Sequence, residues 1–129
     1  ASGTVEVRGR ADDVIVSGGL SIAPGPVRRA VRSFEAISDA WILGTPDEKW
    51  GHVVTALVVV DQMPSDSLEM AELGSEIREH AAAHIGRAQA PRRIVAVEAL
   101  PYLGFDKIDR AAAAQVAAEA SGTERAWVR

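Results

Sequence analysis

The chain has 129 residues, of which 47% are hydrophobic and 25% are charged, and its formal net charge is −4. This length fits one domain with a modest core, and the acidic balance argues against a nucleic-acid partner. The sequence has no cysteine, which excludes disulfides, thiolate metal sites and cysteine nucleophiles. No apolar run reaches the roughly 18 residues that span a membrane, and the first residues lack the layout of a signal peptide. We therefore expect a cytoplasmic protein without a membrane span.

The first part of the chain predicts short strands. Residues 3–9 alternate apolar and polar side chains, as a half-buried strand does. Residues 13–16 and residues 20–23 flank two glycines, Gly18 and Gly19, and this arrangement indicates a small β-hairpin.

A short helix is predicted after the hairpin. Pro24 and Pro26 suit its first turn, where a missing backbone N–H costs little. Its buried face would carry four apolar side chains, Val27, Ala30, Val31 and Phe34. The same helix carries three clustered arginines, which we interpret as a solvated face: Arg28, Arg29 and Arg32.

Three later segments are predicted to form one sheet. Residues 39–44 have the pattern of a buried strand that ends in a turn over residues 45–47. Residues 53–60 are almost continuously β-branched, which is typical of a central strand. Residues 93–97 supply the third strand.

Two more helices accompany this sheet. Ser65 or Ser67 can cap a long helix that reaches about Ile85. An alanine-rich helix is expected over residues 108–120, and the tail over residues 121–129 is expected to fray. The chain is therefore predicted to be an α+β domain, with a three-stranded sheet packed against helices and a small N-terminal β-hairpin.

Gly18 and Gly19 support a first functional hypothesis. Glycines permit a positive φ and a close approach of the backbone to another molecule, so this turn could slide along a ligand or a second domain. An ordinary hairpin turn explains the same residues, and spacing alone favours it. The segment matches neither the phosphate-binding loop nor the dinucleotide fingerprint, so glycine spacing predicts no nucleotide site.

Metal and hydrolase chemistry find little support in the sequence. Asp12 and Asp13 are adjacent, so on a strand their side chains would point to opposite faces and would seldom share an ion. His80 and His84 have the spacing of two ligands on one helix face, but no third ligand follows in a recognisable pattern. His52 has no serine or aspartate partner at a motif spacing. We predict neither a metal site nor a catalytic triad.

Lys107 is the most informative single residue. It is one of two lysines in a chain with twelve arginines, and it lies between a stretch with proline and glycine and an alanine-rich helical pattern. A cation on a turn at a helix entrance can reach a phosphate or carboxylate of a substrate. By itself this position also fits a solvated surface lysine.

Four segments, taken in order, resemble the C-terminal domain of the adenylate-forming enzymes. This superfamily includes acyl-CoA synthetases, aryl-CoA ligases, peptide-synthetase adenylation domains and luciferases. The resemblance covers the chain from about Gly3 to Ala118. The matching segments are residues 9–15 with Gly18, Gly19 and Pro24; residues 43–47 with Trp50 and Gly51; residues 90–94; and Leu100 and Pro101 with residues 107–110.

The resemblance implies roles for particular residues. Lys107 is similar to the lysine that enters the active site during adenylation, where an ammonium would stabilise charge as a carboxylate attacks the α-phosphate of ATP. Asp12 is similar to the hinge residue about which the domain rotates, and Arg10 to an arginine that contacts the nucleotide. A loop that lines the pantetheine tunnel of CoA after rotation would comprise Ser17, Gly18, Gly19 and Leu20.

The resemblance also implies a division of the chain and a set of partners. Residues 1–11 would be the end of an N-terminal domain and the approach to the hinge, residues 12–120 the mobile lid, and residues 121–129 a tail. The partner would be the N-terminal adenylation domain of the same protein. That domain would bind the small carboxylic acid and would make most of the contacts with ATP and Mg²⁺. CoA would be the second substrate. The 129 residues alone are expected to be inactive.

The implied reaction is AMP-forming ligation of a carboxylate to CoA. Trp50, Gly51 and the compact tail look most like o-succinylbenzoate–CoA ligase of menaquinone biosynthesis. The alternatives are a fatty-acyl or aryl-CoA ligase, a peptide-synthetase lid, or a non-catalytic binding module of the same fold. The chain departs from the family pattern at Asp106, where a glycine usually precedes the lysine, and at Pro26 and Arg28, where acidic residues are usual.

Overall fold

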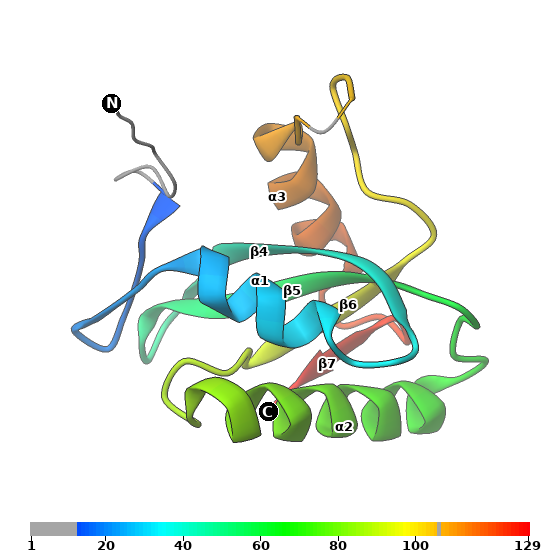
Figure 1. The fold of residues 1–129 in the computed structure, drawn as a ribbon, viewed down its shortest axis with the longest axis horizontal. Helices are drawn as coiled ribbons and strands as arrows, with labels where there is room; N and C mark the ends of the chain where they lie inside the picture. The colour runs from blue at the N-terminus through cyan, green and yellow to red at the C-terminus, as the bar shows by residue number, and fades with distance from the viewer. Residues whose placement is uncertain (1–12, 106) are drawn as a thin grey trace.

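The structure, a computed structural model, describes residues 13–105 and 107–129. Within them a four-stranded sheet has helices on both faces, and a two-stranded hairpin lies beside it (Figure 1). The hairpin strands are β2 (Ile15–Ser17) and β3 (Leu20–Ile22). The sheet strands are β4 (Ile37–Asp47), β5 (Gly51–Val60), β6 (Arg93–Val97) and β7 (Ala126–Val128). The helices are α1 (Pro24–Arg32), α2 (Ser67–Ile85) and α3 (Arg110–Ala120).

The α+β class and the N-terminal hairpin are confirmed, whereas the strand predicted over residues 3–9 lies outside the described residues. No helix in the described part of the chain is both long enough and apolar enough to cross a membrane.

Strand β5 is the centre of the sheet, whose order is β4-β5-β6-β7. It pairs antiparallel with β4 and parallel with β6. Residues 53–58 of β5 are all buried, because helices cover the sheet on both faces. Such two-sided burial favours a continuous run of β-branched and apolar side chains over an alternating one.

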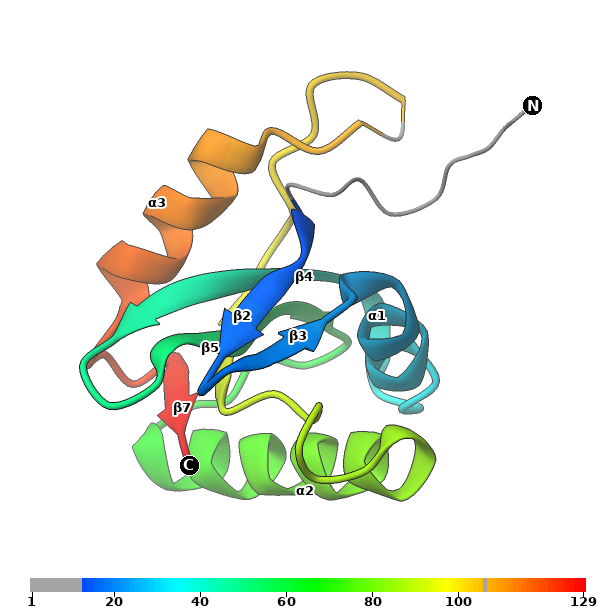
Figure 2. The same cartoon turned by 90° about the vertical axis from the view of Figure 1, so that its left-hand side faces the viewer.

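The helices divide the core into two clusters. Helices α1 and α2 cover one face, where residues such as Val27, Ile77 and Val54 pack together. Helix α3 covers the other face and packs against Leu57 and Val95. Figures 1 and 2 show α3 and α2 on opposite sides of the sheet.

The prediction of a three-stranded sheet with a frayed tail was wrong, because part of the tail forms the edge strand β7. Trp127 lies opposite Ile94 of β6 in the antiparallel register, and its indole packs on α2 at Gly74. A β-carbon at Gly74 would lie only 2.4 Å from Cγ of Trp127. The short tail has no strand pattern of its own, so it is ordered by packing that the local sequence does not reveal.

Three predicted boundaries shift for identifiable reasons. Strand β4 continues through the turn predicted over residues 45–47, since Thr45 pairs with Val53 and its hydroxyl lies 2.7 Å from that of Thr55. Helix α2 is capped by Asp66, whose carboxylate accepts from the N–H of Glu69 at 2.9 Å, and not by the serines on either side. Helix α3 begins two residues later than predicted, with Asp109 as its N-cap.

A buried arginine holds the connection between α2 and β6. Arg78 is 3% exposed, and its guanidinium donates to the carbonyls of Ala90 at 3.0 Å, Pro91 at 2.8 Å and Arg87 at 3.3 Å. Burial, together with the charges of nearby arginines, lowers the pKa of Arg78 to about 10. The side chain therefore remains a cation at neutral pH and satisfies backbone carbonyls that would otherwise be buried without partners.

Gly74→Ala should destabilise the chain by about 1–3 kcal/mol through overpacking, even though alanine favours a helix over glycine by about 1 kcal/mol. The physical reason is the indole of Trp127. In a Trp127→Ala background the same substitution should stabilise the chain. Urea unfolding of the four variants measures the cycle, and equal destabilisation in both backgrounds would contradict the packing of β7 on α2.

Candidate functional site

The structure places the predicted site residues in two separate regions. Ser17, Gly18, Gly19 and Leu20 form the tip of the β2–β3 hairpin. Lys107 lies in the segment that leads into α3. Both views show the hairpin tip and this segment far apart (Figures 1 and 2). Arg10 and Asp12 lie outside the described residues, as does Asp106.

The hairpin tip is a two-residue turn built from glycine. Ser17 pairs with Leu20, and Gly18 and Gly19 between them have φ of 57° and 85°. Positive φ at both central residues is the conformation that matches the twist of a tight hairpin. The turn prediction is confirmed, and both glycines are exposed.

Trp50 fixes the hairpin tip to the rest of the domain. The N–H of Gly18 donates to the carbonyl of Trp50 at 2.9 Å. A β-carbon at Gly18 would lie 2.4 Å from Cε3 of the indole. On the same ring, the guanidinium of Arg92 lies 4.4 Å from the centroid and the ammonium of Lys49 lies 5.5 Å from it. The sequence did not predict this contact, because nothing in the spacing of Trp50 reveals a partner on a distant hairpin.

The segment that carries Lys107 is folded back on itself. The N–H of Leu103 donates to the carbonyl of Lys107 at 2.7 Å, and that of Asp109 donates to the carbonyl of Pro101 at 2.8 Å. Tyr102 and Ile108 form an isolated antiparallel bridge. We call this segment the Lys107 loop; its described residues are 101–105 and 107–109. The side chain of Lys107 is exposed.

Asp39 on β4 gathers polar groups from α1 and from the Lys107 loop. The hydroxyl of Tyr102 donates to Oδ2 of Asp39. Arg28 donates to Oδ1 at 3.3 Å, the N–H of Ala40 donates to it at 2.8 Å, and Nε of Arg32 lies 3.9 Å away. Burial alone would raise the pKa of Asp39, but these hydrogen bonds and the charge of Arg28 outweigh it and lower the pKa.

A second ion pair connects the start of the described chain to α3. Arg110 donates to both oxygens of Asp13, from Nε at 3.0 Å and from the terminal nitrogen at 2.9 Å. The guanidinium groups of Arg110 and Arg28 lie 5.8 Å and 5.4 Å from the ring of Trp41. Asp13 thus serves as the partner of an arginine. Sequence reasoning missed these pairs, since 97 residues separate Asp13 from Arg110.

The histidines make local contacts. Nε2 of His80 lies 2.7 Å from the hydroxyl of Ser33, and Nδ1 of His84 lies 2.9 Å from the carbonyl of His80. In the part of the chain that the structure describes, no three His, Cys, Asp or Glu side chains come together as metal ligands would.

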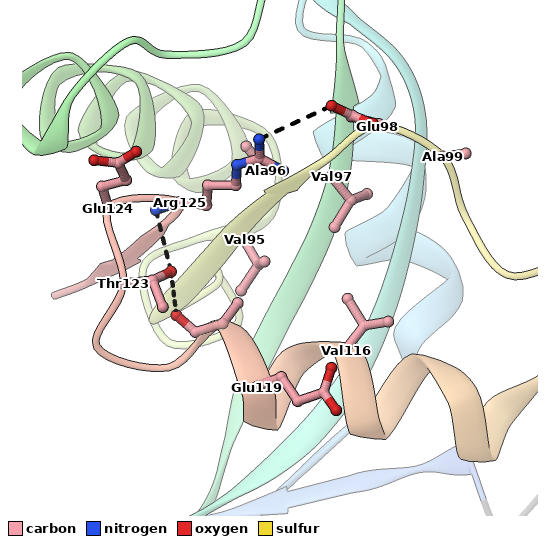
Figure 3. A pocket seen from close by; sticks show the side chains of 11 residues that line it. Val95, Ala96, Val97, Glu98, Ala99, Val116, Glu119, Thr123, Glu124 and Arg125 are labelled. Carbon is pink, nitrogen blue, oxygen red and sulfur yellow. Dashed lines mark hydrogen bonds and ion pairs between the residues drawn. The ribbon is translucent and has the colours of Figure 1, made fainter.

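An open cavity of about 700 Å³ lies between β6, the end of α3 and the following turn. Figure 3 shows the side chains of Glu98, Glu119 and Glu124 around it, with Arg125 3.9 Å from the carboxylate of Glu98. Neither the hairpin tip nor Lys107 lines this cavity. We therefore do not take this cavity as the candidate site.

Gly18→Ala should destabilise the chain by about 2–4 kcal/mol, because it adds a clash with Trp50 to the cost of a positive φ. Gly19→Ala is the matched control. It has a φ of 85° and no heavy atom within 4 Å of the added carbon, so its cost should be about 1–2 kcal/mol from strain alone. Chemical denaturation measures both. Equal costs would show that the indole does not pack on Gly18.

Tyr102→Phe should lower the free energy of unfolding by about 1 kcal/mol at neutral pH, since it removes one hydrogen bond. The pKa of Asp39 is lowered in the folded state, so the stability from its ionised form is present above the unfolded pKa of about 3.9 and is lost as the pH falls through the folded value. The difference between wild type and variant should shrink in acid, and a difference that grows below pH 4 would contradict this contact.

Comparison with known proteins gives concordant results. The sequence profile of the AMP-binding enzyme C-terminal domain matches residues 29–104. A medium/long-chain-fatty-acid–CoA ligase of Mycobacterium tuberculosis, FadD8, is 36% identical over 80% of this chain and 18% of its own length. A probable 2-succinylbenzoate–CoA ligase of the same organism is 38% identical over 86% of this chain and 28% of its own length.

The fold agrees with these matches. The crystal structure of an acyl-CoA synthetase from Brucella canis superposes with a TM-score of 0.73 and 31% identity, covering 86% of this chain and 20% of that one. The chain thus spans only 18% to 28% of the length of these relatives. Because the profile match covers more than half of the 129 residues, the chain belongs to the AMP-binding enzyme C-terminal domain family.

Proposed function

We propose that this chain is the mobile C-terminal lid, residues 12–120, of an ATP-dependent carboxylate–CoA ligase. The enzyme would form an acyl-adenylate and then transfer the acyl group to the thiol of CoA. The observation that carries the proposal is the separation of the hairpin tip from the Lys107 loop (Figure 2). One active site cannot face two distant loops at once, so each loop would serve a different half-reaction after the domain rotates.

Lys107 would act in the first half-reaction. Its exposed ammonium would enter the active site of the N-terminal domain and stabilise the negative charge that develops as a carboxylate attacks the α-phosphate and pyrophosphate leaves. The loop geometry supports this role, because the backbone of Lys107 is paired with Leu103 while its side chain is left in solvent.

The hairpin tip would act in the second half-reaction. Ser17, Gly18, Gly19 and Leu20 would line the path of the pantetheine arm. The two glycines carry no side chain, so a thin thiol arm could pass close to the backbone. Docking of the tip on Trp50 supports a rigid wall for such a path.

The hinge and nucleotide roles of Asp12 and Arg10 rest on the resemblance, as both lie outside the described residues. The neighbouring Asp13 supports the position of the hinge. Its carboxylate is bound at both oxygens by Arg110 of α3, so the chain belongs to the rigid domain from Asp13 onward. A φ/ψ change just before this point would turn the domain as one body.

The acid substrate would be bound by the N-terminal domain, together with ATP and Mg²⁺. We favour o-succinylbenzoate, with a fatty or aryl acid as the alternative. The 2-succinylbenzoate and fatty-acid relatives, at 38% and 36% identity, support both classes almost equally. A non-catalytic binding module of the same fold is the remaining alternative, and the assay below distinguishes it.

Lys107→Ala in the full-length protein should reduce adenylate formation by about 100-fold or more, because one preorganised charge is lost from the transition state. Thioester formation from preformed adenylate should be largely kept. ATP–pyrophosphate exchange measures the first step, with 2-succinylbenzoate, octanoate and 4-chlorobenzoate as trial acids. The control is Lys49→Ala, which removes the other lysine of this sequence and should leave adenylation unchanged. Equal loss of both steps would refute the assigned role, and no exchange with any acid would favour the binding module.

A further inference from the structure

Among the described residues of the Lys107 loop, those at its base are packed into the core, whereas Leu103 and Phe105 at its tip are exposed. Leu100 and Ile108 at the base are 7% and 5% exposed and pack with α3 in the core. At the tip, Leu103 is 63% exposed and Phe105 is fully exposed. Apolar packing therefore fixes where the loop begins and ends, but it does not fix the direction in which the loop projects from the domain.

Tyr102 supplies a polar contact that can set this direction. Its hydroxyl donates to Asp39 of β4, a residue 63 positions earlier in the chain. Tyr102 lies opposite Ile108 in the loop, and the next residue, Leu103, donates its N–H to the carbonyl of Lys107 at 2.7 Å. A displacement of Tyr102 would therefore reach Lys107 through one backbone hydrogen bond.

The acceptor of this contact is itself rigid. Asp39 is bound by the N–H of Ala40 at 2.8 Å and by Arg28 at 3.3 Å. Arg28 in turn donates to the carbonyl of Ala40 at 2.6 Å and lies 5.4 Å from the ring of Trp41. The carboxylate is thus anchored on a sheet strand and is ionised at neutral pH, and hydrogen bonds to charged acceptors are stronger than those to neutral ones.

We propose that Tyr102 is a positioning residue for Lys107, because it ties the Lys107 loop to Asp39 and so presents the ammonium in one orientation. This inference rests on the proposed role of Lys107 in adenylate formation. It concerns residues of this particular chain, in which an aromatic hydroxyl and an anchored carboxylate take part in holding the loop.

Two measurements separate positioning from a merely stabilising hydrogen bond. A contact that only stabilises the domain would change both half-reactions together. A positioning contact would change the order of the loop and the first half-reaction, and would leave the second half-reaction almost unchanged, since the hairpin tip lies elsewhere (Figure 1).

The first measurement is amide hydrogen exchange in the full-length protein. Tyr102→Phe keeps the ring and deletes only the donor, so exchange over residues 101–109 should quicken by about tenfold, as expected for one charged hydrogen bond. Ser38→Ala is the matched control. It deletes a hydroxyl next to Asp39 on β4, one that donates only to Val59 at 3.2 Å, and should leave the loop unchanged. Unaltered exchange in Tyr102→Phe would overturn the proposal.

The second measurement is the rate of each half-reaction, with ATP and the trial acid that the wild type adenylates. Tyr102→Phe should lower kcat for adenylation by about tenfold, since misplaced catalytic groups lose rate more than affinity, while KM for ATP and thioester formation stay close to wild type. Asp39→Asn keeps an acceptor oxygen and should show a smaller loss. Equal loss in both half-reactions would overturn the proposal.

The two proposals can fail separately. If Lys107→Ala leaves adenylation unaffected, the proposed function fails, and the positioning role fails with it even when the exchange result confirms the tether. If Lys107→Ala abolishes adenylation but Tyr102→Phe leaves both exchange and kcat unchanged, only the positioning role is overturned.

Discussion

The arrangement of this domain depends on the burial of β5 on both faces. Residues 53–58 lie between α1 and α2 on one side and α3 on the other. A strand in this position favours apolar side chains on both faces; the buried Thr55 is accommodated because its hydroxyl lies 2.7 Å from that of Thr45. The two buried faces place the helices in two layers. The segment that enters α3 therefore lies far from the hairpin that precedes α1, so the two proposed functional regions are separate and do not share one cleft.

Each of these regions is joined to the sheet by specific contacts in addition to hydrophobic packing. The hairpin tip is held by the carbonyl and the indole of Trp50. In the Lys107 loop, Tyr102 is hydrogen-bonded to Asp39 of β4. Just after the loop, Arg110 of α3 is paired with Asp13. The proposed rotation of this domain as a rigid body would need such contacts, because a loop that moves independently of its domain cannot deliver a catalytic group to a defined place.

Much of the fold could be predicted from local pattern. The β-branched run of β5, the proline-initiated helix α1 and the glycine turn at Gly18 each follow from the conformational limits of their own residues. The errors arose where a distant partner decides the outcome. Strand β7 forms because the indole of Trp127 fits against α2 where Gly74 has no side chain. The last residues of β4 are held by a contact between the hydroxyls of Thr45 and Thr55.

The sequence by itself determined the family, through ordered motifs around Lys107, Gly18 and Trp50, because those short segments are constrained by backbone geometry and chemistry that act locally. Only the tertiary structure decided which groups surround them. The partners Tyr102 and Asp39 are 63 residues apart, and Asp13 and Arg110 are 97 apart. No periodicity connects such pairs, since their approach follows from how β4, α1 and α3 pack around one buried strand.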